Sequence, residues 1–205
     1  MSRVLASMPT IKDGTVPPRM LPNRQKRPRE YLTKSGVEEL ISVAKKRGRY
    51  GYRDATMILI AYRHGLRVIE LCSLRWEQVD FEVGLLHIHR VKHGISSVHP
   101  LRAPELRALR QLQRDSIPSP YLFVTKRGSP MTTAGFRKLL SRVAQLSSLP
   151  FSVHPHMLRH ACGYKLVNEG RETWSIQHYL GHKNIQHTVR YTELQASCFK
   201  EFWQE

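Results

Sequence analysis

The apolar positions of the chain follow helical spacing over most of its length. Within residues 34–47 they fall on one helical face, and Ser35 with Glu38 forms the pattern of a capping box. His64-Gly65 closes the next helical stretch, because glycine commonly follows a helix end. The predicted helices cover residues 34–47, 53–63, 68–74, a segment that begins at Pro104, and residues 132–146, 155–168, 173–180 and 193–203.

Shorter segments are enriched in β-forming residues. Residues 85–90 and 95–101 flank Lys92-His93-Gly94 and predict a β-hairpin, while residues 121–124 predict a short strand or extended piece. Strands and helices do not alternate as a parallel sheet would require. The predicted fold class is therefore mainly α with a small antiparallel β-sheet, an α+β arrangement.

The charge of the chain is strongly unbalanced. Lys and Arg number 33 against 16 Asp and Glu, and the formal net charge of +17 indicates a polyanionic partner, with nucleic acid as the first choice. No apolar run approaches the roughly 18 residues of a membrane span, and the first residues lack the pattern of a signal peptide. Three cysteines without a CxxC pair fit a reducing compartment. We expect a soluble, cytoplasmic protein without a membrane partner.

Residues 1–28 hold five prolines and six basic residues. Proline at this density disfavours helix and sheet, so the segment is either a flexible basic arm that lies along DNA phosphates or a solvated tail. Basic residues that could contact DNA, in this arm, at the hairpin and after residue 124, are Arg24, Lys26, Arg27, Arg90, His93, Lys126 and Arg127.

Four short patches carry candidate chemistry. They are His64–Leu71 (HGLRVIEL), the turn at Lys92, His156–His160 (HMLRH), and Leu180-Gly181-His182 followed by Tyr191. In this order and spacing they resemble the tyrosine recombinases, the phage integrase family, and the resemblance covers about residues 31–198. The segments IHRVKHGISSVHPL and VHPHMLRHACG look closest to the short recombinases that invert fimbrial promoter DNA.

The resemblance implies the tyrosine recombinase catalytic-domain fold and a metal-free and ATP-free reaction. Tyr191 would attack a DNA phosphate and keep the bond energy in a 3′-phosphotyrosyl ester. An ordinary phenol, with a pKa near 10, costs about 4 kcal/mol to deprotonate at pH 7, so the site must accept its proton. Arg67 and Arg159 would neutralise the phosphoryl oxygens with guanidinium forks. The remaining implied roles are general acid for Lys92, proton handling for His156, phosphate binding for His182, orientation of Arg67 for Glu70, and structural support for His160.

Some of these residues have competing interpretations. Arg90 and His93 are rivals of Lys92 as the cation of the hairpin. The histidine pairs 156/160 and 178/182 have the spacing of zinc ligands, but no H-E-x-x-H motif accompanies them, so we predict neither a metal nor a cofactor. Cys72 and Cys162 lie beside apolar residues and are predicted to fill the core.

The resemblance also implies how the chain is divided into domains. Residues 29–192 would form the catalytic domain, and the apolar segment 193–205 would dock as a helix on a neighbouring protomer or on its own body. Most relatives carry an additional N-terminal DNA-binding domain, which the first 30 residues cannot hold. The basic arm, or inverted repeats with accessory DNA-bending proteins, would take over its task.

The sequence thus predicts a site-specific DNA recombinase that inverts or integrates DNA. As the family implies, a homotetramer would act on double-stranded DNA with inverted-repeat recombination sites, through a Holliday junction, in the cytoplasm at the bacterial nucleoid. A non-catalytic DNA-binding protein on the same fold is the main alternative. A relaxing topoisomerase with the same chemistry is a further one.

Overall fold

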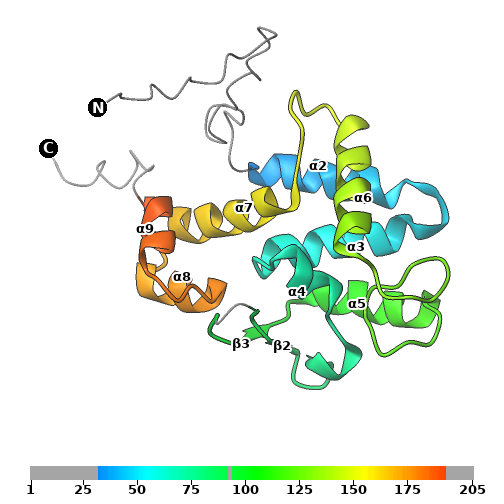
Figure 1. Cartoon of the computed structure of the whole chain (residues 1–205), viewed down its shortest axis with the longest axis horizontal. Coiled ribbons are helices and arrows are strands. Elements are labelled where there is room, and N and C mark those ends of the chain that lie inside the picture. Colours follow the sequence, from blue (N-terminus) through cyan, green and yellow to red (C-terminus); the bar gives the residue numbers. More distant parts are fainter. Residues whose placement is uncertain (1–31, 92–93, 193–205) are drawn as a thin grey trace, which may run out of the picture. The chain divides into compact units, whose positions relative to one another are not determined.

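The structure is a computed structural model that describes residues 32–91 and 94–192. Its longer helices are α2 (Lys34–Lys45), α3 (Gly51–Arg63), α4 (Val68–Cys72), α5 (Ala103–Asp115), α6 (Thr133–Gln145), α7 (Pro155–Asn168), α8 (Thr173–Leu180) and α9 (Gln186–Thr192) (Figure 1). Its strands are β1 (Val79–Asp80), β2 (Leu85–Ile88) and β3 (Ser97–Pro100). The prediction of a mainly α fold with a small antiparallel sheet is confirmed.

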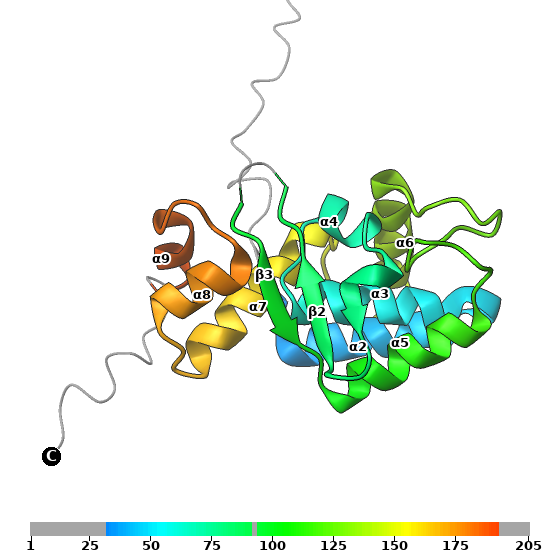
Figure 2. The ribbon, with the colours of Figure 1, turned by 90° about the horizontal axis from the view of Figure 1, so that it is seen from below.

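The sheet lies beside the helices and has the strand order β1-β2-β3 (Figure 2). β2 and β3 form the predicted hairpin, in a register that pairs Leu86 with His99 and Ile88 with Ser97. Side chains of β2 alternate, so that Leu86 and Ile88 are buried and His87 is exposed. β1 pairs with the start of β2 and was not predicted, because a strand of two residues carries no recognisable period.

The core is built around α3, which packs against α2, α5 and α7. Met57, Ile58 and Ile60 of this helix are completely buried, as expected for a helix that is surrounded by others. Cys72 and Cys162 are buried in the same core, which confirms their predicted place. Within the described residues, no helix has the length and hydrophobicity needed to cross a membrane.

Helix α2 begins at Lys34, as predicted, but its N-cap lies two residues before the predicted one. The hydroxyl of Thr33 accepts a hydrogen bond from the backbone N–H of Gly36 at 3.2 Å and thereby caps the helix. Ser35 and Glu38 both lie inside the helix, so the predicted capping box is wrong.

Helices α7 and α8 have the predicted bounds. Pro155 stands at the first position of α7, and Gly181, with φ of 65°, ends α8 in the left-handed conformation. Helix α9 was not predicted. The predicted helix over residues 193–203 lies outside the described residues.

Candidate active site

Arg67 opens helix α4 directly after a sharp turn at Gly65, whose φ of 56° suits a glycine. The backbone N–H of Arg67 donates to Glu70 Oε2 at 2.9 Å, and Arg67 Nη1 donates to Glu70 Oε1 at 2.8 Å. The carboxylate is buried, whereas the Arg67 side chain stays 29% exposed. Glu70 therefore aims a guanidinium that still reaches the surface, which is the geometry that its predicted orienting role requires.

Arg159 is a buried cation on α7. Its Nη1 donates to the carbonyl of Gly65 at 2.5 Å, and its Nη2 donates to the carbonyl of Leu180 at 2.7 Å. Burial and the nearby charges of Arg67 and Arg90 lower the pKa of Arg159 to about 10, so the side chain remains charged at neutral pH. The two carbonyl contacts hold its fork between the turn before α4 and the end of α8.

His182 follows the glycine that ends α8. Its ring is buried, and its Nδ1 lies 2.8 Å from Thr188 Oγ1, a partner that sequence reasoning missed. Burial and the charges of Arg159 and Arg67 lower the pKa of His182 to about 3. The ring is thus neutral at pH 7 and offers hydrogen bonding without a positive charge.

Tyr191 lies on α9, near His182 and near the histidines of α7. Its hydroxyl is 3.1 Å from His160 Nδ1, and the His160 ring lies 4.4 Å from that of His156 between centroids. The Tyr191 ring stacks at 6.3 Å from the His182 ring and meets Tyr164 edge-on at 5.1 Å. The structure therefore brings the predicted nucleophile together with His156, His160, His182 and Arg159 of the same chain.

Gly163 on α7 makes room for the Tyr191 ring. A Cβ atom at this position would lie 2.7 to 2.9 Å from three ring carbons of Tyr191. We expect Gly163→Ala to displace the ring and to slow DNA cleavage by about 100-fold, while DNA affinity stays near that of the wild type. Single-turnover cleavage, with a thermal melt of the same sample, measures this.

Gly36→Ala is the matched control, because a Cβ atom there would make ordinary contacts at 3.4 Å on helix α2. Equal cleavage rates for Gly163→Ala and Gly36→Ala would show that Tyr191 does not need its present position.

Two of these groups line an open concavity of ≈ 860 Å³. Arg67 and His182 line it, together with Lys183, His187 and the exposed ring of Trp174. Within the described part of the chain it combines cations, imidazoles and an aromatic face, which suits a nucleic-acid backbone with its sugars and bases.

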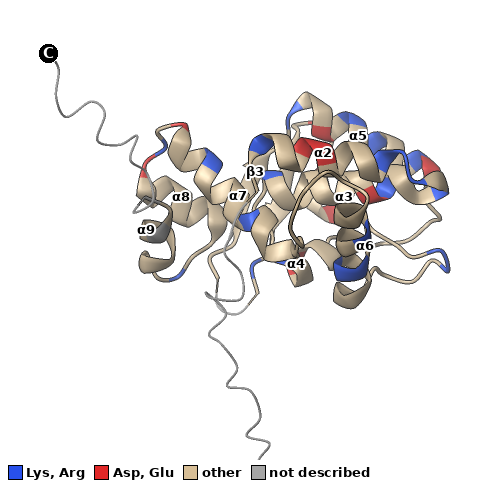
Figure 3. Cartoon of the chain, turned by 90° about the horizontal axis from the view of Figure 1, so that it is seen from above, with Lys and Arg blue, Asp and Glu red and all other residues tan. Residues whose placement is uncertain are grey.

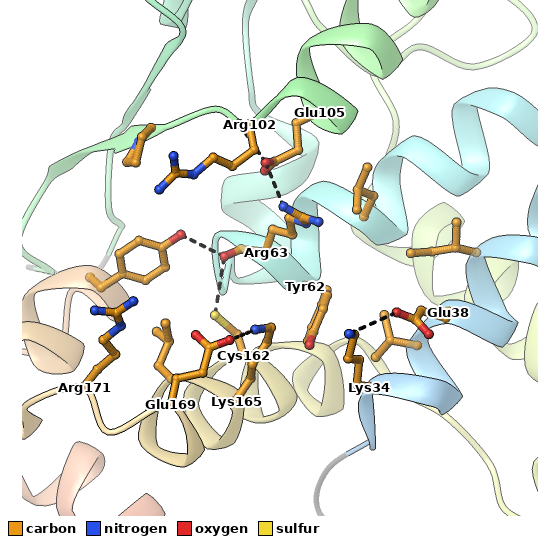
Figure 4. A pocket seen from close by; sticks show the side chains of 16 residues that line it. Lys34, Glu38, Tyr62, Arg63, Arg102, Glu105, Cys162, Lys165, Glu169 and Arg171 are labelled. Carbon is orange, nitrogen blue, oxygen red and sulfur yellow. Dashed lines mark hydrogen bonds and ion pairs between the residues drawn. The ribbon is translucent and has the colours of Figure 1, made fainter.

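A second cavity, of ≈ 440 Å³, lies between α2, α3 and α7 (Figure 4). Its charged groups are mostly paired with one another, as in Lys34 with Glu38, Arg63 with Glu105, and Lys165 with Glu169. Apolar side chains of α2 and α7 form part of its wall, among them Val37, Ile41 and Leu166. The sequence did not predict this cavity.

The prediction that Arg90 contacts DNA does not agree with the structure. The sequence suggested it as a DNA contact, but its side chain is completely buried and donates to Glu70 and to two backbone carbonyls. In this structure the Arg90 side chain has no exposed surface for a DNA contact. The signal was present in the sequence, because Leu86, Ile88 and Arg90 share one face of an alternating strand.

Of the other candidate DNA contacts, the structure describes Lys126 and Arg127, and neither lines the concavity. Lys126 and Arg127 are exposed on the turn after β-bridge residue Val124. Lys92, His93, Arg24, Lys26 and Arg27 lie outside the described residues. In residues 32–91 and 94–192 no three His, Cys, Asp or Glu side chains cluster as metal ligands would.

The fold defines a class, that of the catalytic domains of tyrosine recombinases. The crystal structure of XerA recombinase has a TM-score of 0.73 to this chain at 24% identity, and the match covers 84% of this chain and 63% of XerA. At that identity the likeness concerns the fold.

Sequence comparison identifies the family. A sequence model of the phage integrase family matches residues 30–197, and the protein belongs to this family. FimB, a type 1 fimbriae regulatory protein of Escherichia coli K12, is 38% identical over 180 residues, which are 85% of this chain and 90% of FimB. FimE of the same strain is 38% identical over 182 residues, 86% of this chain and 91% of FimE. The predicted resemblance is confirmed.

Proposed function

We propose that this protein is a site-specific DNA recombinase that cuts and rejoins DNA through a 3′-phosphotyrosyl intermediate, with inversion or integration of DNA as its outcome. One observation carries the proposal. The Tyr191 ring stacks on His182 and interacts electrostatically with Arg159, and His182 lines the same concavity as Arg67.

The reaction has two steps, cleavage of one strand and its joining to another. Tyr191 Oη attacks the phosphorus, a phenolic O–P bond forms, and the P–O5′ bond breaks. The phenolic proton passes to His160, for which the sequence suggested only a structural role, because its Nδ1 lies 3.1 Å from the hydroxyl; His156, the predicted proton handler, lies beside it. The departing 5′ oxygen takes a proton from Lys92. In the second step the 5′ oxygen of another strand forms a bond to the phosphorus as the P–O bond to Tyr191 breaks. The hydroxyl proton goes to Lys92, and His160 returns its proton to the phenolate.

The charge that develops on the phosphoryl oxygens is met by Arg67 and Arg159. Arg67 and Arg90 hold the carboxylate of Glu70, and the charges of both arginines act on nearby Arg159, so the described groups there carry more positive than negative charge. A bound phosphodiester relieves this repulsion. The pentavalent phosphoryl, with its additional negative charge, relieves it further, which favours the transition state over the ground state.

Tyr191 has to be uncovered before it can attack. Its side chain is 2% exposed, and its hydroxyl is engaged with His160. The nucleophile belongs to α9, a helix of seven residues that packs on α7 and α8. We propose that DNA binding shifts α9 relative to α7, so that the hydroxyl becomes accessible to the phosphate while it stays within hydrogen-bond reach of His160.

Surface charge supports double-stranded DNA as the partner. Helix α6, which packs on α4 next to the site, carries exposed Arg137, Lys138 and Arg142 and has no acidic residue (Figure 3). If about ten basic side chains meet phosphates, the logarithm of DNA affinity will fall against the logarithm of salt concentration with a slope near −9. Fluorescence anisotropy between 50 and 300 mM salt, roughly the range over which such slopes are read, measures it.

A duplex of the same length without the recombination site is the control for this slope. It should give a similar value, because backbone contacts dominate the salt dependence. A magnitude below about 3 would remove nucleic acid as the principal partner.

A nicked suicide substrate tests the proposed function itself. The enzyme should form a covalent DNA adduct that survives denaturing electrophoresis, and peptide mapping should place the linkage on residue 191. Specific binding without an adduct would favour the non-catalytic DNA-binding protein. Relaxation of supercoiled plasmid without a specific site would favour the topoisomerase.

The assembly extends this proposal. We propose a homotetramer on inverted-repeat sites, with the basic arm 1–28 along DNA, accessory DNA-bending proteins as further partners, and action in the cytoplasm at the nucleoid. The apolar segment 193–205 would dock on a neighbouring protomer. The cavity of Figure 4 is the proposed acceptor, because Val37, Ile41 and Leu166 make its lining partly apolar.

A further inference from the structure

Arg90 is a buried cation just beyond the end of β2. Its side chain is completely enclosed, and Nη1 donates to Glu70 Oε2 at 2.9 Å. Nη2 donates to the carbonyls of His64, at 3.3 Å, and Tyr179, at 2.5 Å. One guanidinium therefore joins the hairpin to the turn before α4 and to the end of α8.

Arg90 and Arg159 bridge the same two segments side by side. Arg90 links the carbonyls of His64 and Tyr179, while Arg159 links those of the next residues in each segment, Gly65 and Leu180. The two guanidinium groups form parallel links between the turn that leads to Arg67 and the end of α8 that leads to His182. Only Arg90 also holds the carboxylate that orients Arg67.

Stability alone does not account for this arrangement. Burial acts to lower the pKa of Arg90, and the pKa is lowered despite the charge of Glu70, which means that the buried cation is costly. Its Nε–H has no hydrogen-bond partner although it is buried. The chain keeps space for it, because a Cβ atom on Gly181 would lie 2.7 Å from Arg90 Cγ, and one on Gly94 would lie 2.7 Å from Arg90 Cβ.

Glu70, whose carboxylate lies between Arg67 and Arg90, carries the opposite charge. Burial acts to raise the pKa of Glu70, but the charge of Arg90 and the hydrogen bonds from Arg67 and Arg90 outweigh it and lower the pKa. Glu70 is thus fully ionised at neutral pH. It transmits the position of the enclosed Arg90 to the partly exposed Arg67.

We propose that Arg90 is a positioning residue of the cleavage reaction. It orients Arg67 through Glu70, and it fixes the segments 64–65 and 179–180, whose carbonyls at Gly65 and Leu180 bind Arg159. The proposal rests on the proposed function. Arg90 acts without touching DNA, so its loss changes the rate of the chemical step and leaves DNA affinity nearly unchanged.

The test is single-turnover cleavage of the nicked substrate by Arg90→Lys, well below its melting temperature. A lysine keeps the charge but loses the planar fork that reaches the carboxylate and both carbonyls. We expect the cleavage rate constant to fall by about 100-fold and the dissociation constant for DNA to change by less than about threefold. A merely structural role would reduce the fraction of active enzyme, seen as reaction amplitude, and leave the rate constant of the folded enzyme unchanged.

Arg53→Lys is the matched control, because Arg53 is also a largely buried arginine that pairs with a carboxylate, Asp54, and donates to a backbone carbonyl, that of Val124. It should cleave at the wild-type rate. Arg90→Gln provides a second variant. Unchanged rate constants in the Arg90 variants, or failure of both to fold while Arg53→Lys folds, would overturn the proposal. Absence of cleavage by the wild type would instead refute the proposed function.

Discussion

Replacing Tyr191 with phenylalanine is expected to abolish the covalent protein–DNA adduct. The phenylalanine ring fills the same space against Tyr164 and Gly163 but has no oxygen that could form the ester bond. The loss should exceed about 10⁴-fold, as for the removal of nucleophiles in other covalent enzymes. Denaturing electrophoresis after incubation with the nicked substrate measures the adduct, and a gel shift on the same DNA should show binding close to that of the wild type.

Tyr164→Phe is the matched control for this variant. It removes one hydroxyl from the ring that packs edge-on against Tyr191 and is likewise buried. Adduct formation by Tyr164→Phe should stay near the wild-type level. An adduct formed by Tyr191→Phe would assign the nucleophile to another residue and would contradict the proposed chemistry.

Local signals in the sequence were sufficient for much of the helical fold. Helices α7 and α8 were predicted to the residue, because Pro155 and Gly181 mark a start and an end that backbone geometry dictates. Helix α9 was not predicted because its seven residues bury Tyr191 but carry no repeating apolar stripe, and polar contacts also hold it. Asn184 accepts the backbone N–H of Gln186 at 2.9 Å, and Thr188 meets His182. No periodicity of apolar residues reports such contacts.

The candidate site was only partly accessible from the sequence. Arg67, Arg159 and Tyr191 were selected through the order of their motifs, whereas spacing alone does not bring positions so far apart into one place. Arg90 was misjudged because its charge was given more weight than its register on β2. Its partner Glu70 lies 20 residues earlier in the chain, and a tertiary ion pair of this kind reverses the usual preference of arginine for the surface.

Arg159→Lys is expected to reduce the cleavage rate by about 10³-fold or more, the effect of positioned arginines in phosphoryl transfer. Arg159 already donates to the carbonyls of Gly65 and Leu180, so its planar fork is fixed before a phosphate arrives. A lysine ammonium cannot reproduce this planar geometry. Its substitution leaves at least one buried carbonyl without its donor, at a cost of about 1 to 3 kcal/mol in the free energy of unfolding.

For Arg159→Lys, the single-turnover cleavage rate and the DNA affinity should change to different extents. If Arg159 acts mainly on the charge of the pentavalent phosphoryl, the single-turnover rate falls far more than DNA affinity, because ground-state phosphate carries less charge. Arg53→Lys, away from the concavity, should keep both values. A cleavage rate of Arg159→Lys within about tenfold of the wild type would mean that the buried guanidinium serves the fold and that another cation neutralises the phosphate.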